Sequence, residues 1–86
     1  MPQNIVVLCR YGNRIHYLFN KTCELLHKYK GFKCHRGSAQ IFAGELRIRF
    51  MLEDTRSLYE LRHEKNIQFI GSFEWGKMLE RKGQDR

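Results

Sequence analysis

The sequence predicts a small α/β domain, with a mixed sheet of three to five strands packed by two long helices and one short helix. The apolar run at residues 5–8 is followed at once by a segment of helical periodicity, and this order recurs from residue 67. Between them, apolar and basic residues alternate along short segments. The 86 residues are enough for a single domain, 1–86, and we expect frayed ends at 1–3 and 83–86.

Residues 5–8 form a continuous apolar run, typical of a central parallel strand buried on both faces. From residue 12 to residue 30 the apolar period becomes that of a helix. Asn13 is the expected N-cap, and Gly31 is the residue expected to follow the last turn. The face of this helix expected to be buried consists of Ile15, Leu18, Phe19, Thr22, Leu26 and Tyr29.

The middle of the chain predicts three short strands. Residues 32–38 permit an edge strand followed by a turn, and residues 39–43 and 46–50 predict two strands joined by a turn. In the last of these, Leu46, Ile48 and Phe50 point to one face, and Arg47 and Arg49 point to the other. The two arginines either guard a solvated sheet edge or contact phosphates, and both interpretations stay open.

The last third predicts a short helix, a strand and a final helix. Asp54 or Thr55 is the expected cap of a helix that ends near residue 62 and buries Leu58 and Leu61. Residues 67–70 predict a strand ended by a glycine. Ser72 is the expected cap of the last helix, whose apolar residues are Phe73, Trp75, Met78 and Leu79. Alternation of strands and helices implies right-handed crossovers.

The chain is strongly basic, with sixteen Lys and Arg against nine Asp and Glu and a net charge of +7. This excess favours nucleic acid or an acidic protein surface as partner, although basic charge also serves solubility. No apolar run approaches the roughly 20 residues that span a bilayer. The amino-terminal residues lack the pattern of a signal peptide, so we expect a cytoplasmic protein without membrane contact.

A basic loop lies between the first strand and the first helix. Loops at the carboxyl ends of parallel strands, next to the unpaired amides of a helix start, commonly bind anions. The residues expected to bind anions or nucleic acid are those of this loop and the basic residues of the later strands: Arg10, Gly12, Asn13, Arg14, Lys33, Arg36, Arg47 and Arg49.

The three cysteines do not suggest a disulfide framework, because their number is odd and their spacing irregular. They fit a reducing compartment. The alternative is a zinc site formed by Cys9, Cys23, Cys34 and His35, but structural zinc sites usually contain a tight cysteine pair. We therefore expect no metal and no cofactor.

The segment Cys9-Arg10-Tyr11-Gly12-Asn13-Arg14 resembles the active-site loop of rhodanese-type sulfurtransferases, which runs Cys-Arg-x-Gly-x-Arg between a strand and a helix. The resemblance implies a persulfide on Cys9 and anion binding by Arg10 and Arg14. It is local: Ile15 stands where such loops carry a small residue, and the loop comes early in the chain. No family resemblance extends over the whole chain.

The order of the predicted elements is also similar to a reduced nucleotide-binding core of the phage-terminase or helicase kind. Residues 12–15, Gly-Asn-Arg-Ile, lack the Gly-Lys-Ser/Thr that holds phosphate and magnesium, so ATP hydrolysis is not expected.

Two functional hypotheses follow. The first is a non-catalytic module that binds nucleic acid or an acidic protein surface, acting as a regulator or inhibitor. The second is a thiol enzyme of sulfurtransferase type, in which Arg10, Arg14 and the helix start lower the pKa of Cys9. We favour the first, because the charge excess belongs to the whole chain, whereas the second depends on one short loop.

Overall fold

A computed structural model describes residues 3–84 of the chain, which form one five-stranded sheet and three helices. The strands are β1 (Gln3–Cys9), β2 (Lys33–His35), β3 (Gln40–Ala43), β4 (Leu46–Leu52) and β5 (Ile67–Gly71). The helices are α1 (Gly12–Leu26), α2 (Ser57–Leu61) and α3 (Ser72–Gln84). The predicted α/β class, with a mixed sheet, two long helices and one short one, is confirmed.

The strand order is β2-β3-β4-β1-β5. The central strand β1 is parallel to both its neighbours, so that Val6 lies opposite Arg49 on one side and Phe69 on the other. Strands β2, β3 and β4 follow one another as an antiparallel meander. The apolar run at residues 5–8 therefore forms a central parallel strand, as its composition predicts.

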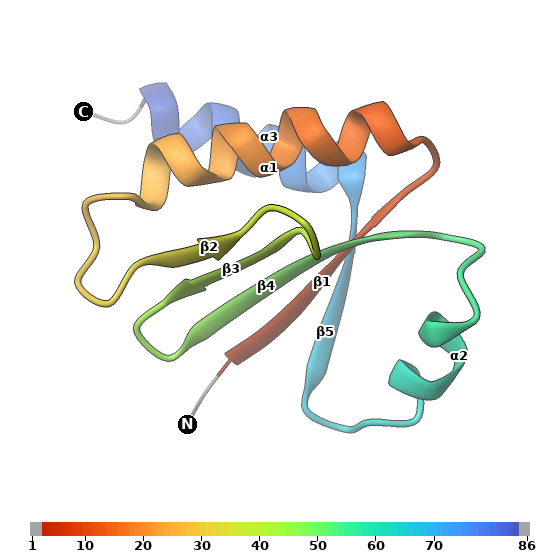
Figure 1. The fold of residues 1–86 in the computed structure, drawn as a ribbon. Helices are drawn as coiled ribbons and strands as arrows, with labels where there is room; N and C mark the ends of the chain where they lie inside the picture. The colour runs from red at the N-terminus through yellow and green to blue at the C-terminus, as the bar shows by residue number, and fades with distance from the viewer. Residues whose placement is uncertain (1–2, 85–86) are drawn as a thin grey trace.

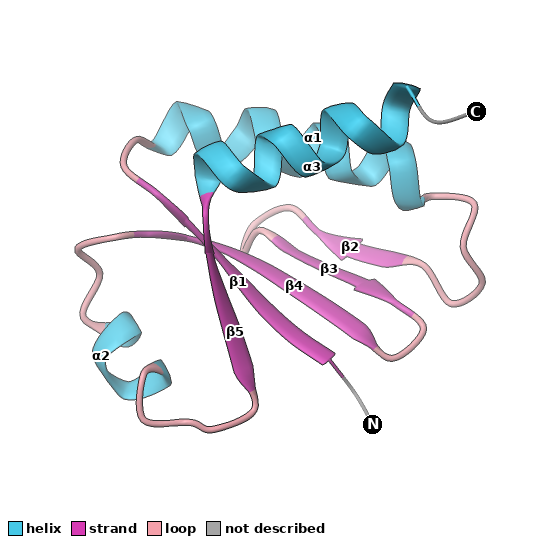
Figure 2. Cartoon of the chain, turned by 180° about the vertical axis from the view of Figure 1, so that it is seen from behind, coloured by secondary structure: helices cyan, strands magenta, loops and turns pink. Residues whose placement is uncertain are grey.

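The two long helices lie over the same face of the sheet, and α2 lies apart from them on the other side (Figures 1 and 2). The crossover from β1 to β4 and the crossover from β4 to β5 run in opposite directions across the sheet. If both are right-handed, their helices α1 and α2 fall on opposite faces. Helix α3 follows β5 directly and packs beside α1.

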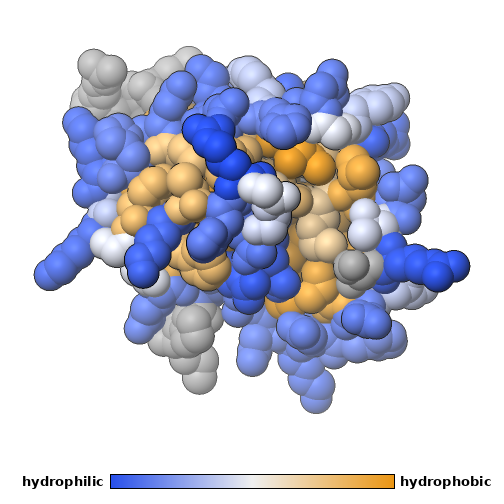
Figure 3. Space-filling model, in the orientation of Figure 1, coloured by the Kyte–Doolittle hydropathy of each residue, from blue (hydrophilic) through white to orange (hydrophobic). Residues whose placement is uncertain are grey.

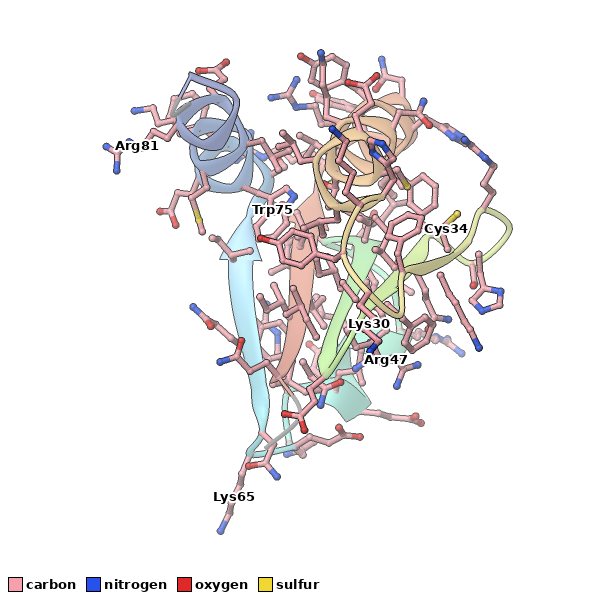
Figure 4. The ribbon with its side chains drawn as sticks, turned by 90° about the vertical axis from the view of Figure 1, so that its left-hand side faces the viewer. Lys30, Cys34, Arg47, Lys65, Trp75 and Arg81 are labelled. Carbon is pink, nitrogen blue, oxygen red and sulfur yellow. The ribbon has the colours of Figure 1, made fainter. Side chains whose placement is uncertain are left out.

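The hydrophobic core fills the space between the sheet and the two long helices. Phe50 of β4 is at its centre, with the rings of Phe19 and Trp75 packed edge-on at centroid distances of 6.0 and 6.5 Å. The indole N–H of Trp75 donates to the hydroxyl of Thr22 at 3.0 Å, and that hydroxyl donates to the carbonyl of Leu18 at 2.7 Å. These buried hydrogen bonds join α3 to α1, and Figure 4 shows Trp75 between the two helices and the sheet.

Several predicted helix ends are wrong. Helix α1 stops at Leu26 and not near residue 30, which leaves Tyr29 exposed. Its N-cap is Tyr11 and not Asn13, and no side chain caps it. Helix α2 likewise begins after Arg56 without a side-chain cap, so neither Asp54 nor Thr55 has the expected role. Tertiary packing outweighs capping preferences here.

The frayed ends expected at residues 1–3 and 83–86 stay a prediction. Gln3 is the first residue of β1, and residues 83–84 belong to α3. The expectation for residues 1–2 and 85–86 falls outside the described residues.

The Thr22 hydroxyl is predicted to be a main support of the helix layer. Thr22→Val keeps the shape but leaves the buried indole N–H of Trp75 without an acceptor, which should lower the free energy of unfolding by about 1–3 kcal/mol. Urea denaturation measures this change, with Tyr17→Phe as a control that removes an exposed hydroxyl on the same helix. If Thr22→Val is as stable as the control, the hydrogen bond between the helices contributes nothing.

Candidate functional site

The face of the sheet that points away from α1 and α3 is the candidate site, and we call it the open face. Because side chains alternate along a strand, the register of the five strands determines which residues share this face. They are Asn4, Val6 and Leu8 of β1, Lys33 and His35 of β2, Gln40 and Phe42 of β3, Arg47, Arg49 and Met51 of β4, and Ile67 and Phe69 of β5. Figure 3 shows apolar areas interrupted by hydrophilic side chains below the helix layer.

All formal charges on the strands are positive and lie on the open face. They belong to Lys33, Arg47 and Arg49, and none of the five strands contains an Asp or a Glu. The imidazole of His35 lies on the same face, opposite Gln40. The strict alternation in β4, which places Leu46, Ile48 and Phe50 on the other face, is confirmed.

Arg47 is held in place by its neighbours. Its Nε and Nη2 atoms donate to the side-chain oxygen of Gln40 at 3.2 and 2.8 Å. Its guanidinium also lies over the ring of Phe42, 5.6 Å from the centroid. Because an arginine has five N–H donors, these contacts orient the group and leave further donors for a ligand.

Arg49 is less well satisfied than Arg47. Among the described residues that are not exposed, its Nε is the buried side-chain nitrogen or oxygen without a hydrogen-bond partner. Burial lowers the pKa of Arg49, the nearby charge of Arg47 lowers it further, and Glu64 opposes both effects. Two like charges are therefore held together at a partly desolvated place, which an anion would relieve.

An aromatic group borders this pair of arginines. The ring of His35 packs edge-on against Phe42 at 5.7 Å, and Lys33 lies directly opposite Phe42 in the neighbouring strand. Arg47 covers Phe42 from the other side along the sheet. We call the set Lys33, His35, Phe42, Arg47 and Arg49 the basic aromatic cluster.

The other predicted anion-binding residues lie elsewhere. Arg10 is exposed and approaches Glu53 at 3.7 Å, while Gly12 and Asn13 are exposed in the first turn of α1. The side chain of Arg14 lies between α1 and α3. Its guanidinium is 5.2 Å from the centroid of the Tyr17 ring and near Gly76 of α3. The loop at residues 9–14 thus stands at the carboxyl end of β1 but does not join the open face.

Arg36 also belongs to another part of the surface. It donates from Nη1 to the side-chain oxygen of Asn20 at 2.9 Å and lies over the ring of Phe19. Both partners are on α1, so Arg36 faces the helix layer. Of the eight predicted binding residues, the structure therefore brings together Lys33, Arg47 and Arg49.

A groove between α1 and α3 offers a second set of cations, but these are accompanied by carboxylates. Arg14, Lys21 and Lys77 line it together with Glu24 and Glu80. Lys21 lies 3.9 Å from Glu24, and such pairs neutralise part of the local charge. The strands of the open face themselves contain no acidic residue, and the nearby carboxylate that acts on Arg49 is Glu64.

Cys9 is fully buried beneath the helices. Burial raises the pKa of its thiol, the charge of Arg14 opposes this rise, and Glu53 adds to it. A raised pKa is the opposite of what a nucleophilic thiolate requires at neutral pH.

No known protein family, curated protein or solved structure matches this chain. Among residues 3–84, no cluster of three or more His, Cys, Asp or Glu is arranged to hold a metal ion. Within the same range, no helix is both long and apolar enough to cross a bilayer.

The sequence reasoning missed the partners that complete the cluster. Phe42, His35 and Gln40 each contact another member of the open face, yet none was predicted to bind anions or nucleic acid, and His35 was considered only as a zinc ligand. The alternation in residues 33–35 and 40–43 was a usable signal, because it places these side chains on the same face as the arginines once the meander is assumed.

The thiols of Cys34 and Cys9 should differ sharply in their rates of modification. We expect an aromatic disulfide reagent at neutral pH to modify the exposed Cys34 first. Cys9 should react at least about a hundredfold more slowly, because its buried thiol meets the reagent only when the structure opens locally. Mass spectrometry of timed samples measures both rates, with the urea-denatured chain as reference. Modification of native Cys9 as fast as in the denatured chain would revive the thiol enzyme hypothesis.

Proposed function

We propose that the chain is a small, non-catalytic binding module whose open face takes up a single-stranded nucleic acid. The observation that carries the proposal is the pair Arg47 and Arg49, two cations held side by side with one buried Nε lacking a partner. Such an arrangement costs stability in the free protein and is relieved by an anionic ligand. The overall charge of +7 supports a polyanionic partner.

The spacing of the cations suits a chain of phosphates. Arg47 and Arg49 are two residues apart on one strand, which separates their Cα atoms by about 7 Å. Lys33 extends the positive charge across β3 to the edge of the sheet. A flexible strand that tracks these groups would place successive phosphates near successive cations.

The aromatic groups favour nucleic acid over an acidic protein surface. Single-stranded nucleic acids bind sheet faces through stacking of bases on aromatic rings and arginine planes. Phe42, His35 and the guanidinium of Arg47 form such a set next to the cations. An acidic protein surface would use the charges but would have no particular need for the rings.

The cluster is suited to binding and not to bond breaking. Arginine, lysine and phenylalanine supply charge, hydrogen-bond donors and stacking surface, and His35 packs against Phe42 with no Ser, Cys or carboxylate in the cluster beside it. The one nucleophile predicted from the sequence, Cys9, lies on the opposite face under the helices. We therefore place the binding module ahead of the thiol enzyme.

Binding should depend on the open face more than on net charge. For a labelled single-stranded oligonucleotide of mixed sequence, we expect Arg47→Gln/Arg49→Gln to weaken affinity at least about tenfold, because charged hydrogen bonds are lost. The slope of log affinity against log salt should also become shallower by about 1.4, from about 0.7 per phosphate contact. Fluorescence anisotropy at several salt concentrations measures both quantities.

The matched control is Lys77→Gln/Arg81→Gln, which removes the same charge from α3; Figure 4 shows Arg81 on the outer side of that helix. It should change affinity less than threefold. Equal loss in both double variants would show that binding is unspecific charge attraction. If the chain does not bind oligonucleotides but binds polyglutamate, its partner is an acidic protein surface and the proposal is wrong.

A further inference from the structure

One face of α1 meets the β2 end of the sheet. Phe19, Asn20 and Cys23 share this face, since residues three and four apart on a helix are neighbours. Arg36, which follows β2, reaches two of them, with its guanidinium 5.6 Å from the centroid of Phe19 and its Nη1 2.9 Å from Asn20. The contacts fix Cys23 on the side of α1 that looks toward β2.

Cys34 approaches the same place from the sheet. In β2 it lies opposite Ile41, a core residue on the helix side of β3, so its side chain points toward the helix layer (Figure 4). Its thiol lies close enough to that of Cys23 to raise the pKa of Cys23. Cys34 is exposed and Cys23 half-buried, so that a small reagent reaches the pair from solvent.

The thiol of Cys23 is held in its protonated form at neutral pH. Burial, followed by the neighbouring Cys34, raises the pKa of Cys23 to about 11, and the charge of Arg36 opposes the rise. The pair therefore consists of two neighbouring thiols, one on α1 and one on β2.

We propose that Cys23 and Cys34 are a dithiol modification site that a low-molecular-weight disulfide oxidises to an intramolecular disulfide. The inference is independent of the proposed nucleic-acid binding. It also accounts for the odd number of cysteines, because Cys9 is buried in the core and takes no part.

The reaction is two successive thiol–disulfide exchanges. Exposed Cys34 loses its proton and attacks one sulfur of the reagent, which breaks the reagent's S–S bond and releases one thiol. Cys23 then loses its proton and attacks the sulfur of Cys34, which forms the Cys23–Cys34 bond and releases the second thiol. The protein loses two protons and two electrons, and the reagent gains them.

The cross-link would attach a short edge strand of the sheet to α1. Strand β2 is an edge strand of three exposed residues, joined to α1 by the loop at residues 27–32. A covalent bond from α1 to the middle of β2 closes a short loop and removes freedom from the unfolded chain. The oxidised protein should therefore be the more stable form.

The experiment incubates the native chain with oxidised glutathione near pH 8, followed by alkylation, intact-mass measurement and peptide mapping. We expect a loss of two hydrogens, a Cys23–Cys34 cross-link within one chain, and a melting temperature higher by about ten degrees than that of the reduced chain. Cys23→Ser should stop at a glutathione adduct on Cys34. Cys34→Ser should form no cross-link, and neither variant should gain stability.

Three results would overturn the proposal. They are a glutathione adduct that persists on Cys34 of the native chain, a disulfide that joins two chains or includes Cys9, and a Cys23–Cys34 cross-link that lowers the melting temperature. Mapping the unsubstituted chain decides the first two without relying on the folding of any variant.

Discussion

A sheet has two faces, and in the described part of this chain both long helices cover the same one. The crossovers of the parallel strands send α1 and α2 to opposite sides, but α2 has only five residues, while α3 returns to pack beside α1. Trp75 holds this helix layer together through its ring contact with Phe50 and its hydrogen bond to Thr22. The open face is therefore left largely to the side chains of the strands themselves.

The residues on the open face reflect the fact that both long helices cover the other face. Val6 is fully buried there although no long helix covers it, while Arg47 and Arg49 beside it carry like charges. Such a pair weakens the free protein, and a sequence selected for stability alone would separate the charges or pair them with carboxylates. A bound polyanion, as proposed above, would offset this cost.

Much of the fold could be predicted because local pattern and final environment agree. The β-branched run of β1 and the strict alternation of β4 gave the central strand and the arginine pair correctly. What failed depends on packing between distant segments. Asn13 was expected to cap α1 and Tyr29 to be buried, yet the helix starts after Tyr11 and ends at Leu26. The partnership of Phe42 with Arg47 required the register of β3 and β4, which local sequence does not contain.

The lowered pKa of Cys9, which the thiol enzyme hypothesis requires, is wrong for the same reason. Arg14 does oppose the rise in the pKa of Cys9, as the sequence suggested, but burial by the helix layer outweighs it.

The most direct test of the open face is an NMR titration of the isotope-labelled chain with a short single-stranded oligonucleotide. If the open face binds the oligonucleotide, we expect saturable amide and side-chain shifts concentrated at Lys33, Phe42, Arg47 and Arg49. Shifts concentrated in the α1–α3 groove, or at the loop of residues 9–14, would contradict it.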